Sequence, residues 1–345
     1  MPVDGFQPKT PYPNGRVIMM PYPYVSVIIP VLNAEKHIDV CLNALKEQTY
    51  PEDSYEIIAV DNGSSDNSFQ KLSNRGINVG LIRKKGRSRA LNKALEMARG
   101  DIICSTDISC IADPDWIRSI VKSFENPEVG CVAGEIRLIK YPKNRVIEFQ
   151  DRVNYMSPMY AAERVSLPFL PYADGANASF RRSVFEKLGF FDEAFFKAAD
   201  VEICYRILML SDYKIVFDKN AVVWEYGEPS LFSLLKQRYR IGLGQILIEK
   251  KYNALFHKKK LSLRKFYWAG AELLAGISRI EGIKSHMLYD KLVFLLMRLW
   301  QKIGNTYGRI NLKNYRIENF NPEHVKRFAD EFDREKVKKR IMVKA

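Results

Sequence analysis

Three polar residues, Asn33, Asp61 and Asp107, each follow a short apolar run that has the pattern of a buried strand. Taken singly, a residue of this kind is usually a turn residue or a helix cap. The carboxyl ends of parallel strands meet at one edge of a sheet, however, and the ligands of open α/β sheets bind at that edge. The three residues together therefore indicate a pocket lined by carboxylates and amides.

Several common chemistries lack their motifs in this chain. No G-x-G-x-x-G follows the first apolar run and no G-x-x-x-x-G-K-[S/T] occurs, so neither dinucleotide nor P-loop binding is expected. The chain has no G-x-S-x-G elbow and only four His, which disfavours Ser–His hydrolase chemistry. The five Cys show no C-x-x-C spacing, so zinc is not expected and free thiols in a reducing cytosol are the simplest interpretation.

The elements that would position these side chains alternate along the chain. Apolar runs at 25–30, 55–60, 79–82 and 101–106 predict strands, and helical patterns cover about 34–48, 68–74, 88–98 and 114–124. Alternation at this rhythm predicts a Rossmann-like α/β domain, with a doubly wound, mostly parallel sheet and right-handed crossovers.

The net charge of +14 is concentrated at one end of the chain. The last 95 residues contain 22 Lys and Arg against 9 Asp and Glu, whereas the first 250 contain 32 against 31. This distribution excludes a protein that is basic all over and binds polyanions by bulk attraction. We predict an N-terminal extension over 1–24 without the features of a signal peptide, a globular domain over 25–250 and a basic helical appendage over 251–345. No apolar run is long enough to predict a membrane-spanning helix.

A series of segments, in this order, resembles a known family. They are Val-Ser-Val-Ile-Ile-Pro-Val-Leu-Asn-Ala-Glu at 25–35, Val-Asp-Asn-Gly-Ser-Ser-Asp at 60–66, Arg-Ala-Leu-Asn at 89–92, Thr-Asp-Ile-Ser-Cys-Ile-Ala-Asp-Pro-Asp-Trp at 106–116, and three further segments at 174–182, 188–193 and 199–206. The series resembles glycosyltransferase family 2, the nucleotide-sugar transferases of the GT-A fold, over about two-thirds of the chain. The resemblance implies a GT-A fold with a nucleotide-sugar half over 25–115 and an acceptor half over 116–250.

The resemblance also implies the central roles. Asp61 would bind the nucleobase, Asp107 would contact the ribose or a metal, and Asp200 would be the base that deprotonates the acceptor hydroxyl. The diphosphate leaving group needs positive charge as its bond to the sugar breaks, and a divalent cation, Mn²⁺ or Mg²⁺, would supply it. A single base that drives in-line displacement implies an inverting reaction.

The predicted metal segment departs from the family pattern. The family's second Asp is Ser109 here, and a His that follows a later strand in the family is replaced by Glu225. Because hard cations prefer oxygen ligands, the hypothesis is that Asp107 and Glu225 share the metal, with Ser109 beside them. The alternatives are that Glu225 pairs with a surface cation, or that Ser109 marks a lost metal site.

Further residues are expected around the donor and the acceptor. Arg87 and Arg89 could hold the diphosphate, although the basic run that contains them is also typical of a solvated loop. Gly175 leaves room for a ligand, and Asn177 offers a side chain for sugar hydroxyls. The donor set is Pro30, Asn33, Glu35, Asp61, Arg87, Arg89, Asn92 and Asp107, and the acceptor set is Gly175, Asn177, Glu202, Gln237 and Arg240.

Asp200 and Glu202 would lie about 200° apart on a helix, so they do not form the paired carboxylates of a retaining mechanism. Glu202 is also positioned to pair with Arg206, four residues on. The segment from Gln237 to Arg240 resembles a Gln/Arg-rich helix of related transferases, but it lacks the Trp of the processive ones, so we expect the addition of one sugar.

The basic end predicts two helices, at 266–280 and 288–303, the second with an apolar stripe, a Trp and basic flanks. Such a helix can lie in a membrane interface, or the two can pack on the globular domain as a hairpin. The positive charge favours an anionic membrane surface. Residues 331–344 are expected to be a charged helix or disordered.

Together, the residues and the resemblance predict a cytoplasmic, metal-dependent, inverting transferase, peripheral on the inner face of the cell membrane. It would add one sugar to a glycan or lipid-linked acceptor in polysaccharide biosynthesis. The alternative is a non-catalytic GT-A-like protein that binds nucleotide sugars or membranes. No nucleic-acid partner is expected, because the chain has no stacking motif and no recognisable reader fold.

Overall fold

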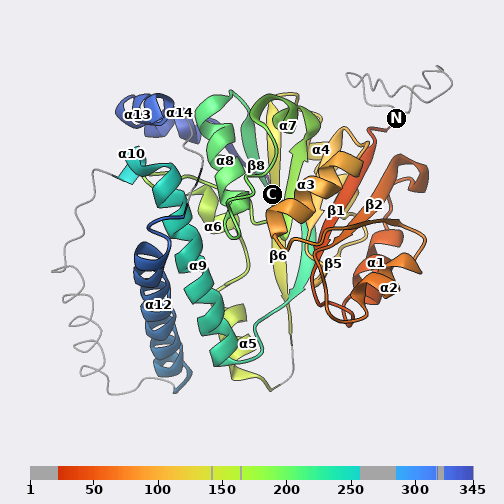
Figure 1. Cartoon of the computed structure of the whole chain (residues 1–345), viewed down its shortest axis with the longest axis horizontal. Helices are drawn as coiled ribbons and strands as arrows, with labels where there is room; N and C mark the ends of the chain where they lie inside the picture. The colour runs from red at the N-terminus through yellow and green to blue at the C-terminus, as the bar shows by residue number, and fades with distance from the viewer. Residues whose placement is uncertain are drawn as a thin grey trace.

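One mixed sheet organises the molecule (Figure 1). The computed structural model describes residues 22–140, 143–163, 165–256, 285–315, 317 and 322–344. The strands are β1 Val25–Val31, β2 Tyr55–Asp61, β3 Asn78–Leu81, β4 Ile102–Thr106, β5 Cys110–Ala112, β6 Val129–Ile139, β7 Asn177–Arg181, β8 Lys214–Tyr226 and β9 Ile341–Lys344. Their spatial order is β3-β2-β1-β4-β7-β6-β8-β5, and β9 also pairs with β8.

The helices follow the strands in the predicted rhythm. They are α1 Ile38–Lys46, α2 Ser68–Ser73, α3 Arg87–Met97, α4 Trp116–Ser123, α5 Arg145–Arg152, α6 Met159–Ala162, α7 Arg182–Leu188, α8 Ala199–Leu210, α9 Leu231–Lys251, α10 Asn253–Phe256, α12 Ser285–Asn311, α13 Pro322–Asp330 and α14 Arg334–Lys338, with a 3₁₀ turn at Glu52–Ser54. Strands β1 to β4 pair in parallel, and β7 is antiparallel to both of its neighbours. The predicted mostly parallel α/β sheet is confirmed.

Helices on both faces explain why the central strands are apolar along nearly their whole length. Every residue of β2 and β4 is buried, as are all but one of β1. Successive side chains of a strand point to opposite faces, so Ile28 packs in the cluster that contains Ala94 of α3, and Ile29 in the cluster that contains Leu42 of α1. The two layers hold the carboxyl ends of β1, β2 and β4 at one edge.

Helix α12 packs along α9, and glycines allow the two backbones to approach closely (Figure 1). A Cβ added at Gly304 would lie 2.2 Å from the carbonyl oxygen of Tyr239, and one added at Gly242 would lie 2.3 Å from that of Gln301. No larger residue fits at either place without moving a helix. The position of α12 is therefore fixed relative to α9.

The C-terminal end forms a strand that the sequence did not indicate. β9 pairs in parallel with β8, with Ile341 opposite Ile215. Just before it, Arg340 donates hydrogen bonds to the carbonyl oxygens of Leu208 (2.8 Å) and Ile207 (2.9 Å) at the end of α8. The prediction of a charged helix or disorder over 331–344 was wrong for the last of these residues, because the strand partner is distant in the sequence.

The other predictions for the C-terminal part have mixed outcomes. The predicted helix at 288–303 is confirmed within α12, whereas the predicted helix at 266–280 and most of the extension 1–24 lie outside the described residues. The division into 25–250 and 251–345 stays a prediction. All five Cys are buried and unpaired. No helix in the described ranges combines the length and the apolar character needed to cross a membrane.

We expect Gly304→Ala to destabilise the protein by about 2 kcal/mol or more, because the new methyl group would collide with the backbone of α9. Denaturant unfolding followed by circular dichroism measures this change. Thr306→Ala, on the exposed side of the same helix, is the matched control and should leave the free energy of unfolding nearly unchanged. Equal stability of the two variants would contradict the close contact of the helices.

Candidate active site

One cleft at the carboxyl edge of the sheet collects charged side chains from several elements. Arg87 begins α3, Asp107 follows β4, Asp174 precedes β7, Asp200 lies in the first turn of α8, and Glu225 lies near the end of β8. All five line a cavity of about 1960 Å³, whose wall continues along α9 and α12. Residues that are far apart in the sequence therefore share one site.

The backbone of Gly175 orients the carboxylate of Asp200. The N–H of Gly175 donates to Oδ2 of Asp200 at 2.8 Å. A Cβ added at Gly175 would lie 3.0 Å from the guanidinium of Arg87 and 3.1 Å from Oδ2 of Asp200. The absence of a side chain thus lets a carboxylate and a guanidinium approach the same stretch of backbone.

Arg87 is the cation that the carboxylates of the cleft share. Its guanidinium forms an ion pair with Asp107. Burial opposes its charged form, but the neighbouring Asp107, Asp200 and Asp174 outweigh burial and raise the pKa of Arg87. Arg87 therefore keeps its positive charge among these carboxylates.

Two of these carboxyl groups hold their protons more tightly than usual. Burial and the nearby Asp200 raise the pKa of Asp174 to about 6. Burial, Asp107 and Asp174 raise the pKa of Glu225 well above its usual value. A bound cation would relieve the repulsion among these groups, so the electrostatics of the cleft favour one.

The donor atoms fit a hard divalent cation. The pairing of β5 with β8 places Glu225 opposite Cys110, whose N–H bonds the carbonyl of Asp107 at 2.9 Å, and Ser109 lies in the turn between them. Mg²⁺ is usually bound by one or two carboxylates together with substrate phosphates. Within the ranges that the structure describes, no three His, Cys, Asp or Glu are grouped so that they could hold a metal. The fit is thus to a cation that two carboxylates and a substrate bind together.

Asp61 retains an unused acceptor at the end of β2. Its Oδ2 accepts hydrogen bonds from the N–H groups of Gly63 (3.1 Å) and Ser64 (3.0 Å), whereas its buried Oδ1 has no partner among the described residues. A buried acceptor without a partner is costly and favours a ligand that donates to it. Asn33, with a positive φ of 51°, accepts from the N–H of Ser65 at 2.8 Å and joins the loops after β1 and β2.

Three other residues of the predicted donor set, like Asp61 and Asn33, are not among those that line the cavity. Pro30 is within β1, and Glu35 accepts a hydrogen bond from the side chain of Asn67 at 3.2 Å. Arg89 forms an ion pair with Glu193 at 2.9 Å. Of the two arginines that were expected to hold a diphosphate, Arg87 lines the cleft and Arg89 binds the loop that precedes α8.

Two of the predicted site residues, Asn92 and Asn177, form hydrogen bonds with other parts of the protein. The side chain of Asn92 donates to the carbonyl of Phe191 (2.9 Å) and accepts from its N–H (3.0 Å). Asn177 is 1% exposed, accepts from the indole of Trp116 at 2.8 Å, and donates its two amide hydrogens to backbone carbonyls. Asn177 has no donor left for a sugar hydroxyl, and Asn92 is 9% exposed with its oxygen and one amide hydrogen bonded to Phe191.

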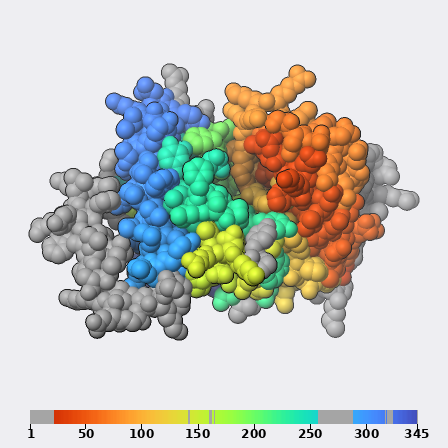
Figure 2. Space-filling view, turned by 90° about the horizontal axis from the view of Figure 1, so that it is seen from below, coloured from red at the N-terminus to blue at the C-terminus, as the bar shows by residue number. Residues whose placement is uncertain are grey.

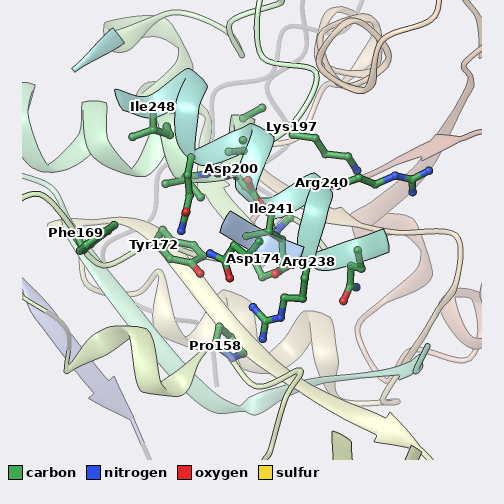
Figure 3. A pocket seen from close by; sticks show the side chains of 18 of the residues that line it. Pro158, Phe169, Tyr172, Asp174, Lys197, Asp200, Arg238, Arg240, Ile241 and Ile248 are labelled. Carbon is green, nitrogen blue, oxygen red and sulfur yellow. Dashed lines mark hydrogen bonds between the residues drawn. The ribbon is translucent and has the colours of Figure 1, made fainter. Parts of the chain in front are cut away.

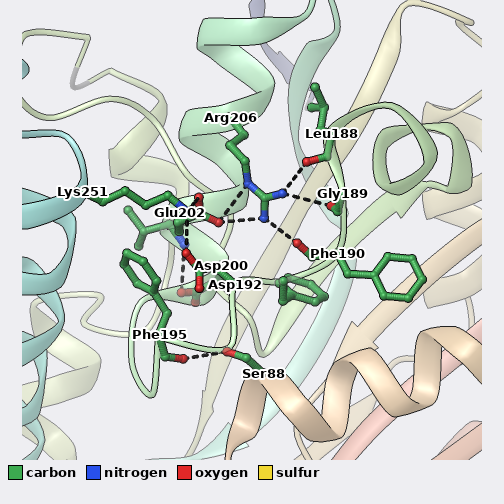
Figure 4. Close-up of polar contacts among 12 residues, drawn as sticks. Ser88, Leu188, Gly189, Phe190, Asp192, Phe195, Asp200, Glu202, Arg206 and Lys251 are labelled. Atoms are coloured by element: carbon green, nitrogen blue, oxygen red, sulfur yellow. Dashed lines mark hydrogen bonds and ion pairs between the residues drawn. The ribbon is translucent and has the colours of Figure 1, made fainter. Parts of the chain in front are cut away.

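Glu202 lies in a buried network of charges (Figure 4). Its carboxylate has no exposed surface and contacts Arg206 (2.7 Å), Lys251 (2.8 Å) and the hydroxyl of Tyr252 (2.8 Å), and Lys251 also contacts Asp192 at 2.6 Å. The predicted pairing with Arg206 is confirmed. Because cations enclose the carboxylate, it is not accessible to an acceptor.

The side of the cleft formed by α9 is positively charged (Figure 3). The guanidinium of Arg238 lies 4.6 Å from the ring centre of Tyr155, and its buried Nε has no hydrogen-bond partner in the described part of the chain. Lys197 and Arg240 lie near each other, and burial, Arg87 and Arg240 lower the pKa of Lys197. Gln237 accepts a hydrogen bond from the Tyr155 hydroxyl.

Four residues of the cleft were missed by reasoning from the sequence: Tyr155, Asp174, Lys197 and Arg238. Asp174 opens one of the segments that carry the family resemblance, so its position in that segment could have identified it. Arg238 likewise lies within the Gln237–Arg240 segment, whereas Tyr155 and Lys197 have no comparable signal. Lys197 reaches the cleft because the residue after it, Ala198, has a φ of 63° at the start of α8.

Comparisons with known sequences identify the relatives of the chain. The model of glycosyl transferase family 2 matches residues 26–189, and that of glycosyl transferase family group 2 matches residues 109–301. The chain is 28% identical over 260 residues to Glycosyltransferase AglE of Haloferax volcanii. This match covers 74% of this chain and 81% of that protein. It is 29% identical over 310 residues to the probable glycosyltransferase YdaM of Bacillus subtilis, at 84% and 73% coverage.

Among solved structures, the chain is similar to the mannosyltransferase PcManGT from Pyrobaculum calidifontis in complex with GDP-Man and Mn²⁺. The TM-score is 0.57 with 20% sequence identity, and the match covers 83% of this chain and 88% of that one. This similarity shows that the two chains share the GT-A fold, as predicted.

Asp174 should make the stability of the protein depend on pH. An unfolded Asp loses its proton near pH 3.8, whereas Asp174 in the folded protein loses it near pH 6. Between these values the folded state binds more protons, so this contribution to stability is present at low pH and is lost as the pH rises from about 4 to about 6. Thermal unfolding from pH 4 to pH 7 in the presence of a chelator measures it.

Asp174→Asn should flatten that part of the stability curve. Asp53→Asn, at an exposed position, is the control and should keep the wild-type curve. If the Asp174→Asn protein followed the wild-type pH dependence, the raised pKa of Asp174 would be refuted.

Proposed function

Because the chain belongs to glycosyltransferase family 2, whose members transfer sugars from nucleotide donors, we propose that it is an inverting sugar transferase with Asp200 as its base. The observation that carries this proposal is the position of Asp200 in one cleft with the Arg87–Asp107 ion pair. The cleft thus combines a group that can take a proton with groups that can hold a diphosphate and its cation.

Asp200 takes the proton of the acceptor hydroxyl as that hydroxyl attacks the anomeric carbon. The hydrogen bond from Gly175 holds the carboxylate, so little reorganisation is needed when the proton moves. Glu202, on the same helix, is enclosed by Arg206 and Lys251 and supplies no second carboxylate for a covalent intermediate. One base and one in-line displacement give inversion.

The donor is held at its two ends. Oδ1 of Asp61, which is buried without a partner among the described residues, accepts an N–H of the nucleobase. Arg87 contacts oxygens of the diphosphate, for which a guanidinium has suitable geometry and charge. These contacts leave the sugar near Asp200, because the guanidinium of Arg87 and the carboxylate of Asp200 both approach Gly175.

Asp107 and Glu225 would hold a Mn²⁺ or Mg²⁺ ion, with Ser109 in the adjacent turn. When bound, the cation acts as a Lewis acid that stabilises the negative charge of the diphosphate leaving group. Arg87, paired with Asp107, adds positive charge on the same side of the cleft. The raised pKa values of Asp174 and Glu225 support a bound cation, since they reflect carboxylates that lack enough positive charge nearby.

The acceptor is a hydroxyl of a glycan or a lipid-linked saccharide. Gln237, Arg238 and Arg240 on α9 and Lys197 opposite them would bind its polar part, and apolar residues of α9 and α12 line the rest of the wall. We propose that the enzyme acts in polysaccharide biosynthesis as a peripheral protein on the cytoplasmic face of an anionic membrane, without a nucleic-acid partner.

The competing function is nucleotide-sugar binding without transfer. Ser109 in place of a carboxylate and the pairing of Asp107 with Arg87 favour it, because both reduce the number of oxygens free for a cation. Incubation with a panel of nucleotide sugars and Mn²⁺ distinguishes the two functions. Release of nucleoside diphosphate that a chelator abolishes supports the transferase, whereas a rise in melting temperature without release supports the binding protein.

We expect Asp200→Asn to lower kcat by about 10²- to 10⁴-fold, because the amide keeps the hydrogen bond from Gly175 but cannot take a proton. The KM for the donor should change less than about threefold, since the base does not hold the donor. Initial rates with the donor found in the panel measure both constants. Asp53→Asn serves as the exposed control, and undiminished turnover of the Asp200→Asn enzyme would overturn the assignment.

We expect Glu225→Gln to weaken the binding of Mn²⁺ by about tenfold or more, because the neutral amide loses the charge that attracts the cation. Calorimetric titration of Mn²⁺ in the presence of the nucleoside diphosphate measures the affinity. Glu47→Gln changes an exposed carboxylate that is distant from Glu225 in the sequence. It should bind Mn²⁺ as the wild type does. Equal affinity of the wild type and Glu225→Gln would exclude Glu225 as a ligand.

A further inference from the structure

Helix α12 exposes a ridge of large aliphatic side chains. Six of them, spaced three, four or seven residues apart, remain between 39% and 69% exposed: Leu288, Leu292, Leu295, Leu299, Ile303 and Ile310. At 100° per residue they fall within about 80° of the circumference of the helix, along a length of roughly 33 Å. A continuous apolar strip of this kind on a protein surface indicates an interaction site.

The opposite face of α12 is already occupied. Val293 and Met297 are 1% and 2% exposed in a cluster with Leu234 and Leu235 of α9. Gly304 lies against the backbone of α9, as described above. Among the residues that the structure describes, the helix is thus attached through one face, and the ridge is a second apolar face that this packing does not use.

Basic side chains border the ridge on one side. Lys291, Arg298, Lys302 and Arg309 recur at intervals of seven, four and seven residues, and all are exposed. Arg309 already forms an ion pair with Glu249 of α9 at 2.8 Å, so the charge of the border comes mainly from the other three. Partial burial, and then the neighbouring cation Arg298, lower the pKa of Lys302. The only acidic residue of α12 is Asp290, which pairs with Arg152 of α5 at 2.6 Å.

We propose that this ridge and its basic border, called here the α12 docking face, bind the surface of a bilayer that contains anionic lipids. The inference rests on the proposed function and deepens it, since it names the surface through which the enzyme reaches its membrane. Aliphatic side chains enter the boundary between headgroups and acyl chains, while the lysines and arginines contact lipid phosphates.

The charges favour a bilayer over a second copy of the chain. A symmetric pair of ridges would bring two basic borders close together, whereas anionic headgroups neutralise them. The position of the face also suits the reaction. Lys302, Ile303 and Ile310 line the cleft that contains Asp200, so the acceptor side of the cleft opens next to the membrane. In Figure 2, α12 (blue) lies on the side away from the N-terminal half (red and orange).

Flotation of the full chain with phosphatidylcholine vesicles, with and without 30% phosphatidylglycerol, tests the proposal. The wild type should float with the anionic vesicles and much less with the neutral ones. Leu292→Glu/Leu299→Glu should reduce binding by about tenfold or more. The matched control is Phe69→Glu/Leu81→Glu, which changes two side chains of similar exposure on other elements and should float as the wild type does.

A second variant separates charge from apolar contact. Lys291→Gln/Lys302→Gln should weaken binding to the anionic vesicles by about tenfold and leave the weak binding to neutral vesicles unchanged. Neither variant alters a buried side chain, and circular dichroism verifies that each protein is folded.

Failure of the wild type to float, or flotation of both α12 variants at the wild-type level, would overturn the proposal. So would gel filtration that showed a wild-type dimer dissociated by Leu292→Glu/Leu299→Glu, because the ridge would then join two copies. Release of nucleoside diphosphate in vesicle-free solution tests the transferase function separately, so the two proposals can fail independently.

Discussion

The buried carboxylate of Glu202 is the constraint on which the arrangement of the cleft depends (Figure 4). A charge without exposed surface is tolerated only when cations and hydrogen-bond donors surround it, and Arg206, Lys251 and Tyr252 do so. Loss of one partner would leave an uncompensated charge in the interior. The positions of α8 and α9 are therefore linked, because each provides part of the same network.

The network also holds the loop between α7 and α8. Arg206 donates to three successive carbonyls of this loop, at 188, 189 and 190, and Lys251 contacts Asp192. The carbonyl of Phe195 then accepts a hydrogen bond from Ser88, the residue after Arg87, at 2.6 Å. A continuous series of contacts thus connects the helix that carries Asp200 with the helix that carries Arg87. These contacts link the carboxylate of Asp200, the proposed base, to the guanidinium of Arg87 through the protein between them.

The sequence predicted the parts of the site that depend on strand order. Asp61 and Asp107 could be placed because parallel strands end at one edge, whatever packs on their faces. Asn92 and Asn177 could not be interpreted correctly, since a buried amide and an exposed one have the same local pattern, and only the fold shows that Phe191 and Trp116 are their partners. The role of Lys251 as a partner of Glu202 could not be predicted either. It lies 49 residues from Glu202 in the chain, and no spacing rule connects them.

The pairing of β9 with β8 has a consequence for how the molecule is made. The edge of β8 around Ile215 stays unpaired until residues near Ile341 are available. These residues leave the ribosome only after α9, α12 and α13 have been synthesised. Until then the edge is an open template to which strands of other chains can add. Contacts of such large sequence separation also form slowly. A nascent chain is therefore most prone to aggregation between the translation of β8 and that of β9. A chaperone that binds the chain during this interval would increase the yield of folded protein.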